Sequence, residues 1–365
     1  MSTVRALLRH TLFRVVVGLA LLATVGLALW WRGPDWNSVY HAFDFVQWRW
    51  IAVAVLVNLA SVSARAIAWH LVVNQALPEP HPRHRVVFSA FCVGLLANAV
   101  LPARAGEIGR VAVLRRRLPH GSGTTATLFG TVFAHRIFDL FPVLLLIGYT
   151  LETAKIPGWA LTSIKLFVAV GLALFLFALW SARRQHRSVL DEMHPLRRLL
   201  VMAQRGLAVM KRPGAAAGAV LFQTIGWTLQ LLAVYTVMLA FGFGTVPAAA
   251  LVLVLMNVAT VFPFWPGNVG LLQAAIAVPL LQYGVDYGTG FAFGLALQAV
   301  EMSVGVGLGL VFLAREGISF ANLRSIEDET AEDSEDDVRT SAAHAVEERP
   351  ADVPEDEPAR AGLSR

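Results

Sequence analysis

Residues 97–117 read A-N-A-V-L-P-A-R-A-G-E-I-G-R-V-A-V-L-R-R-R, in the middle of a long apolar region. Within ten residues this stretch contains three residues that break helices and three that carry charge. They are Pro102, Gly106 and Gly109, and Arg104, Glu107 and Arg110. Irregular backbone at membrane depth is tolerated only where it is buried in protein or lines a cavity, and charge at that depth marks function. The stretch therefore predicts a broken helix whose charged side chains face the interior of a membrane protein.

The composition of the whole chain also predicts a membrane protein. Of its 365 residues, 56% are hydrophobic and 15% are charged, and the mean hydropathy is +0.60. Several apolar runs exceed the roughly 20 residues that a helix needs to span a bilayer. We therefore expect an all-α integral protein of the cell membrane, with no nucleic-acid partner. The single cysteine, Cys92, excludes an internal disulfide and argues against a cysteine metal site.

The apolar runs predict about six transmembrane helices and two re-entrant helical hairpins. The six spans are the run that ends at Trp31 and residues 50–73, 124–150, 160–181, 215–241 and 287–314. Arginines gather in the loops at 78–85, 115–117 and 183–212. The positive-inside rule places these loops, and both termini with them, in the cytoplasm.

Two stretches outside the spans have distinctive compositions. Residues 32–49 are aromatic and carry few basic residues, so we expect a loop in the outer interfacial belt. Residues 326–365 are acidic and lack apolar periodicity, and we expect a disordered cytoplasmic tail. The chain thus divides into a membrane domain at 1–325 and a tail at 326–365.

The two predicted hairpins occupy matching places in the sequence. The first combines residues 86–101 and 106–114, and the second combines 247–262 and 271–283. A shift of 161 positions makes three pairs of helix breakers coincide, namely Pro102 with Pro263, Gly106 with Gly267, and Gly109 with Gly270; Pro266 also lies in the second turn. At almost the same shift Asp139 falls beside Glu301. Two halves of opposite orientation, at about 12–150 and 160–314, would place a binding site near the bilayer midplane.

The charged residues inside the apolar segments recur at a spacing of three, which puts them on one side of a helix. This spacing separates Arg104, Glu107 and Arg110, and also Arg136 from Asp139 and Gln298 from Glu301. One interpretation is that they form buried ion pairs, Glu107 with an arginine and Arg136 with Asp139. The other is that they line a cavity for an anionic head group, because the arginine fork matches phosphate and helix N-termini at Gly106 and Gly267 would add N–H donors.

Three further residues have either two interpretations or a structural one. Arg65 either snorkels to the interface or has a role in the pore. Trp265, in the uncharged second turn beside Asn268, either stacks on a sugar or anchors the hairpin. We expect a structural role for His135, since a lone helical histidine is more often structural.

Catalytic and cofactor-binding patterns are missing from the sequence. It contains no metal-ligand cluster, no nucleophile–base arrangement and no P-loop. We therefore expect no cofactor, no enzymatic activity and no ATP-driven pumping by this chain alone.

Three motifs resemble those of the lysylphosphatidylglycerol synthase transmembrane-region family, which is also described as flippase-like. They are L-P-A-R-A-G-E-I-G-R at 101–110, A-H-R-I-F-D at 134–139 and P-G-N-V-G-L-L-Q-A-A at 266–275. The resemblance covers roughly residues 12–314. It implies movement of a lipid with a charged or sugar head group between leaflets, with Arg104, Glu107, Arg110, Arg136 and Asp139 on motif positions.

The sequence departs from that family in two respects. Gln273 stands where the family usually has an acidic residue, which argues against a proton-coupling or cation-binding role for the second hairpin. Only the short acidic tail follows the last span, so we expect that the chain does not make lysyl-lipid itself.

Three functions compete at this point. The first is a flippase for a phosphate-bearing membrane lipid, such as a polyprenyl phosphate or a modified phospholipid. The second is a non-transporting scaffold for a lipid- or glycan-synthesising enzyme, with the acidic tail as its docking arm. The third is a membrane-embedded transferase, which the short outer loops disfavour.

Overall fold

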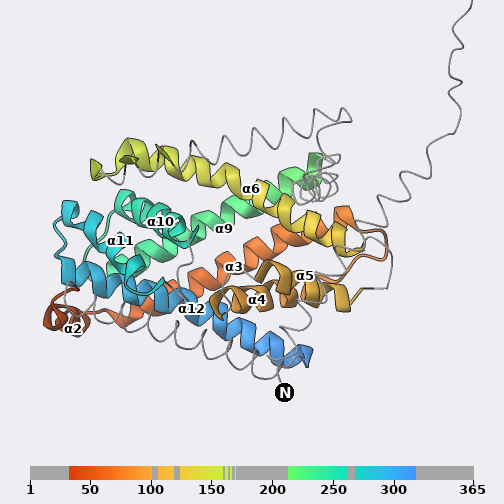
Figure 1. Ribbon diagram of the computed structural model, residues 1–365, viewed down its shortest axis with the longest axis horizontal. Helices are drawn as coiled ribbons and strands as arrows, with labels where there is room; N and C mark the ends of the chain where they lie inside the picture. Colours follow the sequence, from red (N-terminus) through yellow and green to blue (C-terminus); the bar gives the residue numbers. More distant parts are fainter. Residues whose placement is uncertain are drawn as a thin grey trace, which may run out of the picture.

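The computed structural model describes residues 33–100, 106–118, 124–158, 161–162, 165–166, 169, 213–261 and 268–317. Throughout this part the regular elements are helices, which confirms the expected all-α membrane protein (Figure 1). They are α2 (Trp36–Asp44), α3 (Trp48–Ala76), α4 (His84–Val100), α5 (Gly106–Arg116), α6 (Thr124–Thr153), α9 (Pro213–Ala240), α10 (Val246–Val261), α11 (Leu271–Leu280), η4 (Leu281–Tyr283) and α12 (Tyr287–Glu316). The expected span that ends at Trp31 and most of the one at 160–181 lie outside the described residues.

Four of these helices are long and apolar enough to cross a membrane. They are α3, α6, α9 and α12, and they match the predicted spans within a few residues. Capping residues explain where some of these helices begin and end. Asp286 begins α12 by accepting a hydrogen bond from the backbone N–H of Thr289 at 3.0 Å, and Gly317, with φ of 65°, ends it.

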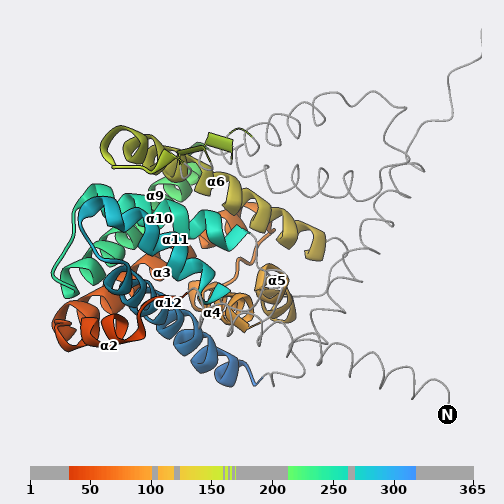
Figure 2. The ribbon, with the colours of Figure 1, turned by 60° about the vertical axis from the view of Figure 1, so that its left-hand side comes forward.

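Helix α2 occupies residues 36–44, within the stretch 32–49 where an aromatic loop was expected. Asp35 starts α2 because its carboxylate accepts hydrogen bonds from the Asn37 backbone N–H at 3.0 Å and the Ser38 hydroxyl at 2.9 Å. Val39 is buried, whereas Trp36 and Tyr40 are exposed. Figures 1 and 2 show α2 packed beside α12, so the segment is an amphipathic helix rather than a loop.

Helices α3 and α9 pack against each other along the centre of the bundle. Figure 1 shows α4 and α5 toward one end of this pair, and α10 and α11 toward the other. The neighbours correspond in the two halves, because α4 packs on α12 while α10 packs on α6, and α5 packs on α6 while α11 packs on α12. The central pair thus brings elements from both halves to one buried interface.

The first hairpin is held together by a glycine contact. A Cβ atom added to Gly106 would lie 2.0 Å from the carbonyl oxygen of Gly94, so α4 and α5 approach as closely as they do only because both residues are glycine. The backbone N–H of Gly106 donates to Asn98 Oδ1 at 3.0 Å and begins α5. The helix then continues through Gly109, which was expected to break it.

The structure describes part of the turn of the second hairpin, and the turn of the first lies outside the described residues. Pro102 and Arg104 in the first turn, and Pro263, Trp265, Pro266 and Gly267 in the second, lie outside the described residues. Gly270 has φ of 90° and precedes α11, and Asn268 has φ of 45°. Both conformations belong to a turn, as the sequence predicts for this position.

Candidate functional site

A cavity of about 140 Å³ lies between α3, α4, α5, α6 and α9. Its lining combines charged and polar side chains with apolar ones. The lining residues are Arg65, Phe91, Gly94, Leu95, Asn98, Gly106, Glu107, Arg110, His135, Arg136, Asp139 and Gln223. Three arginines and two acids with one cavity between them form an unusual centre in a membrane protein.

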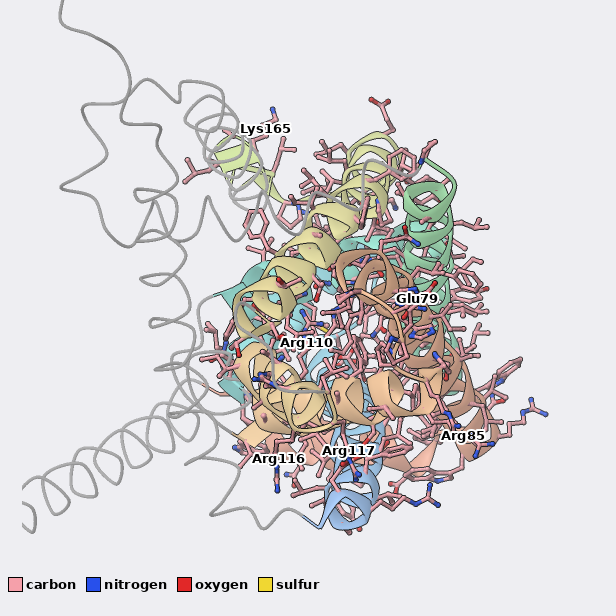
Figure 3. The ribbon with its side chains drawn as sticks, turned by 90° about the vertical axis from the view of Figure 1, so that its right-hand side faces the viewer. Glu79, Arg85, Arg110, Arg116, Arg117 and Lys165 are labelled. Carbon is pink, nitrogen blue, oxygen red and sulfur yellow. The ribbon has the colours of Figure 1, made fainter. Side chains whose placement is uncertain are left out.

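The structure brings together four of the predicted site residues. Glu107 and Arg110 come from α5, and Arg136 and Asp139 come from α6. Figure 3 shows Arg110 inside the bundle, whereas Arg116 and Arg117 project from its rim. Asn268 and Glu301 do not line this cavity, and Arg104 and Trp265 lie outside the described residues.

Arg136 is paired with both acids of the cavity. Its Nε and Nη2 atoms lie 2.7 Å and 2.6 Å from Glu107 Oε1, and its Nη1 lies 3.4 Å from Asp139 Oδ2. The side chain of Arg136 is 47% exposed, and that of Glu107 is 32% exposed. The ion-pair interpretation therefore describes Arg136, which ties α5 to α6.

Asp139 is also bonded through its second carboxylate oxygen. Oδ1 accepts hydrogen bonds from the Trp227 indole N–H at 2.7 Å and from the Gln223 side-chain amide. Both donors belong to α9. Asp139 therefore joins α6 to α9 at the wall of the cavity.

Arg110 differs from Arg136 in having no acidic partner within the described residues. It is 5% exposed, and its Nε and Nη2 atoms are buried without a hydrogen-bond partner there. Its guanidinium lies 4.9 Å from the centre of the Trp69 ring and 5.9 Å from that of Phe91. These cation–π contacts offset part of the cost of burying the charge, but they leave N–H donors unused at the cavity wall.

Arg65 lines the cavity, which decides between its two interpretations. It lies over the Trp227 ring, 4.9 Å from the ring centre, and its Nε is also buried without a partner in the described part. A Cβ atom on Gly226 would lie 2.7 Å from Arg65 Cγ. The absence of a side chain at Gly226 therefore makes room for Arg65 between α3 and α9.

Several residues of the site were missed from the sequence. Gln223, Trp227 and Gln230 lie on one face of α9 at a spacing of four and three, which is a signal that the sequence offered. Asn98 lies inside the stretch quoted first. His135, expected to be structural, is buried and also lines the cavity.

The second hairpin forms a neutral network instead of a charged cavity. Gln273 Oε1 accepts from the Gly270 backbone N–H, and Gln273 Nε2 donates to Gln298 Oε1, each at 2.6 Å. Asn268 Nδ2 donates to the carbonyl oxygen of Ala259 at 3.0 Å. Glu301 accepts from Gln230 Nε2 at 2.5 Å. The bonds of Asn268 and Gln273 close the hairpin and join it to α12, whereas the Gln230–Glu301 bond joins α9 to α12.

The charges of the first site favour a single anion. With histidine taken as neutral, Arg65, Arg110 and Arg136 against Glu107 and Asp139 leave a formal charge of +1. In the described part of the chain no group of three His, Cys, Asp or Glu residues could hold a metal ion. The cavity has room for several water molecules and hence for a phosphate group.

Comparisons with known proteins agree with this architecture. The chain is 22% identical over 320 residues to a UPF0104 membrane protein of Methanothermobacter thermautotrophicus, covering 80% of this chain and 90% of that protein. It is 25% identical over 207 residues to a UPF0104 membrane protein of Methanocaldococcus jannaschii, covering 54% and 84%. No solved structure matches. The profile described as "Lysylphosphatidylglycerol synthase TM region" matches residues 14–309, so the chain is a multi-pass membrane protein that belongs to this family.

Proposed function

We propose that this protein moves a phosphate-bearing lipid between the leaflets of the membrane, and that the cavity between α3, α4, α5, α6 and α9 binds the phosphate. Arg110 carries this proposal. A buried guanidinium with unused donors is costly in a membrane protein, and an anion from the lipid supplies the missing acceptor.

The chemistry of the lining supports phosphate over other anions. A guanidinium donates in pairs to phosphate oxygens, and Arg65 and Arg110 reach the cavity from different helices. The backbone at the start of α5 lies at the same wall, where a helix N-terminus favours negative charge. The acyl or polyprenyl chains of the lipid would remain in the bilayer while the head group occupies the cavity.

The surrounding architecture supports transport over catalysis. Two short helix pairs packed against a central pair of spans are typical of transporters that bind at the midplane. Among the described residues that line the cavity, none is a serine, threonine or cysteine that could act as a nucleophile. Both termini are proposed to lie in the cytoplasm, because three arginines, Arg115 and the exposed Arg116 and Arg117, stand at the end of the first hairpin.

Lipid movement in liposomes tests the proposal. Purified protein is reconstituted with fluorescent anionic, cationic and zwitterionic phospholipids and with a short polyprenyl phosphate. We expect Arg110→Ala to abolish movement and Arg116→Ala, an exposed arginine on the same helix, to leave it unchanged. Equal movement by both variants would contradict the proposal. No movement of any lipid by folded wild-type protein would favour the scaffold.

A further inference from the structure

Two acids lie against one face of α9, and they have different partners. Gln223 and Trp227 bond to Asp139, and Gln230 bonds to Glu301. The seven positions between Gln223 and Gln230 correspond to about 10 Å along the helix. Asp139 thus belongs to the cavity, and Glu301 forms a second acidic position about two turns away along the same face.

Arg65 lies between these two positions. It faces Gly226, which stands between Gln223 and Gln230 on α9, and the same shift of 161 positions that aligns the hairpins aligns Arg65 with Gly226. The charge of Arg65 interacts with both Asp139 and Glu301. Among the described residues no carboxylate oxygen lies within 4.0 Å of its guanidinium nitrogens, so neither acid holds it.

Glu301 is a partly buried carboxylate whose contacts are neutral. Gln230 donates to it, and Ser61 in turn donates to Gln230 Oε1 at 3.2 Å. Among the helices packed on α12, α3 brings the charged side chain of Arg65 to Gly226, about one turn from the Gln230 that bonds to Glu301. The other charged or titratable residues of α2, α3 and α4 are Tyr40, His41, Asp44, Arg49, His70, His84 and Arg85, all within two turns of a helix end, and Cys92 in the middle of α4. Helix α9 contributes Tyr235, within two turns of its end, and α11 contributes none.

The charges in the described core balance when the cavity is empty. Arg65, Arg110 and Arg136 stand against Glu107, Asp139 and Glu301. A monoanionic phosphodiester in the cavity would leave one negative charge in excess, which the membrane interior disfavours. It would also draw Arg65 away from Glu301, because the added charge lies on the side of Asp139.

We infer that Glu301 is a proton-binding site linked to the cavity through Arg65, and that it takes up one proton from water for each monoanionic phosphate head group bound. The proton converts the Glu301 carboxylate to the neutral acid and restores charge balance, while the Arg65 guanidinium interacts with the bound anion. This inference rests on the proposed phosphate site. It makes head-group binding a proton-coupled event and gives the transporter a route to use a proton gradient.

Isothermal titration calorimetry measures this uptake without any transport. Purified wild-type protein in detergent is titrated with a short-chain phosphatidylglycerol, in two buffers that differ in ionisation enthalpy. The difference between the two binding enthalpies gives the number of protons taken up. We expect about one per bound lipid for the wild type. We expect none for Glu301→Gln, which keeps the Gln230 contact and still binds, and about one for the control Glu316→Gln, at the end of the same helix.

Arg65→Gln provides a second test through a different residue. Without Arg65 the described core carries an excess negative charge before any lipid arrives, so Glu301 already holds its proton and uptake on binding is lost. Uptake of a full proton by folded Glu301→Gln protein, or binding by the wild type without uptake, would overturn the inference while leaving the phosphate site in place. Proton uptake by a wild type that moves no lipid in liposomes would support the inference and overturn the proposed function instead.

Discussion

Arg136 Nε donates to Glu107 Oε1 at 2.7 Å, and this ion pair joins the second helix of the first hairpin to α6. Both side chains are partly exposed, at 47% and 32%, so the pair is screened more than a fully buried one. The same guanidinium reaches Asp139 at 3.4 Å. Arg136 therefore holds the two acids of the cavity in place, while Arg65 and Arg110 keep donors for a ligand.

Replacing Glu107 by glutamine should destabilise the protein by about 1–2 kcal/mol. This lies between the small contribution of an exposed pair and the larger loss when a buried pair is broken. The measurement is the unfolding free energy in mixed micelles for Glu107→Gln, Arg136→Gln and the double variant. A coupling energy near 1 kcal/mol is expected, and strictly additive effects would show that the pair contributes nothing.

Replacing Gly106 by alanine should separate α4 from α5. The new Cβ would lie 2.0 Å from the Gly94 carbonyl oxygen and 2.6 Å from Asn98 Cγ, and such overpacking costs about 1–3 kcal/mol. Gly148→Ala in α6 is the matched control, because nothing lies within 4 Å of its Cβ position and a helical alanine is favoured over glycine. We expect a lower melting temperature for the first variant and an equal or higher one for the second. The same melting temperature for both would refute the contact.

Replacing Asp286 by alanine should cost about 1 kcal/mol, since this residue caps α12. Hydrogen bonds from Thr289 lower the pKa of Asp286, and its contribution to stability is therefore fully present above the unfolded-state pKa of about 3.9. It is lost as the pH falls through the lower folded-state value. Thermal unfolding of wild type, Asp286→Ala and Asp286→Asn should show the largest deficit for alanine at neutral pH, converging in acid. A deficit that grows in acid would contradict this assignment.

The sequence predicted the elements that depend on local signals. The long spans follow from apolar run length, and the hairpin break follows from Pro102 and Gly106. The charges of the site were recognisable because Glu107 and Arg110, like Arg136 and Asp139, share one side of a helix at a spacing of three. Which acid pairs with which arginine depends on packing between helices, and no local signal encodes it.

The features that the sequence did not predict involve uncharged side chains or depend on contacts between helices. Gln223 and Trp227 carry no charge and lie in an ordinary apolar span, so their role appears only when α9 packs against α6. Helix α2 begins at the N-cap Asp35. The aromatic composition of the segment favoured an interfacial loop, and the capping signal at Asp35 was not used. Gly109 was expected to break the helix. It lies instead one turn inside α5, whose start is fixed by the hydrogen bond from Gly106 to Asn98.

Replacing Asp139 by asparagine should tighten anion binding and slow transport. The change raises the formal charge of the cavity from +1 to +2 and releases Arg136 from one partner, while the asparagine oxygen can still accept from Trp227. Removing a negative charge about 6 Å from the anion, at an effective dielectric constant of about 20, changes binding by roughly 2–3 kcal/mol. The dissociation constant for short-chain phosphatidylglycerol should therefore fall by at least about tenfold. Lipid movement should slow as release becomes limiting. Glu316→Gln is the charge-matched control outside the cavity, and weaker binding by Asp139→Asn would show that this carboxylate, rather than the arginines alone, contacts the head group.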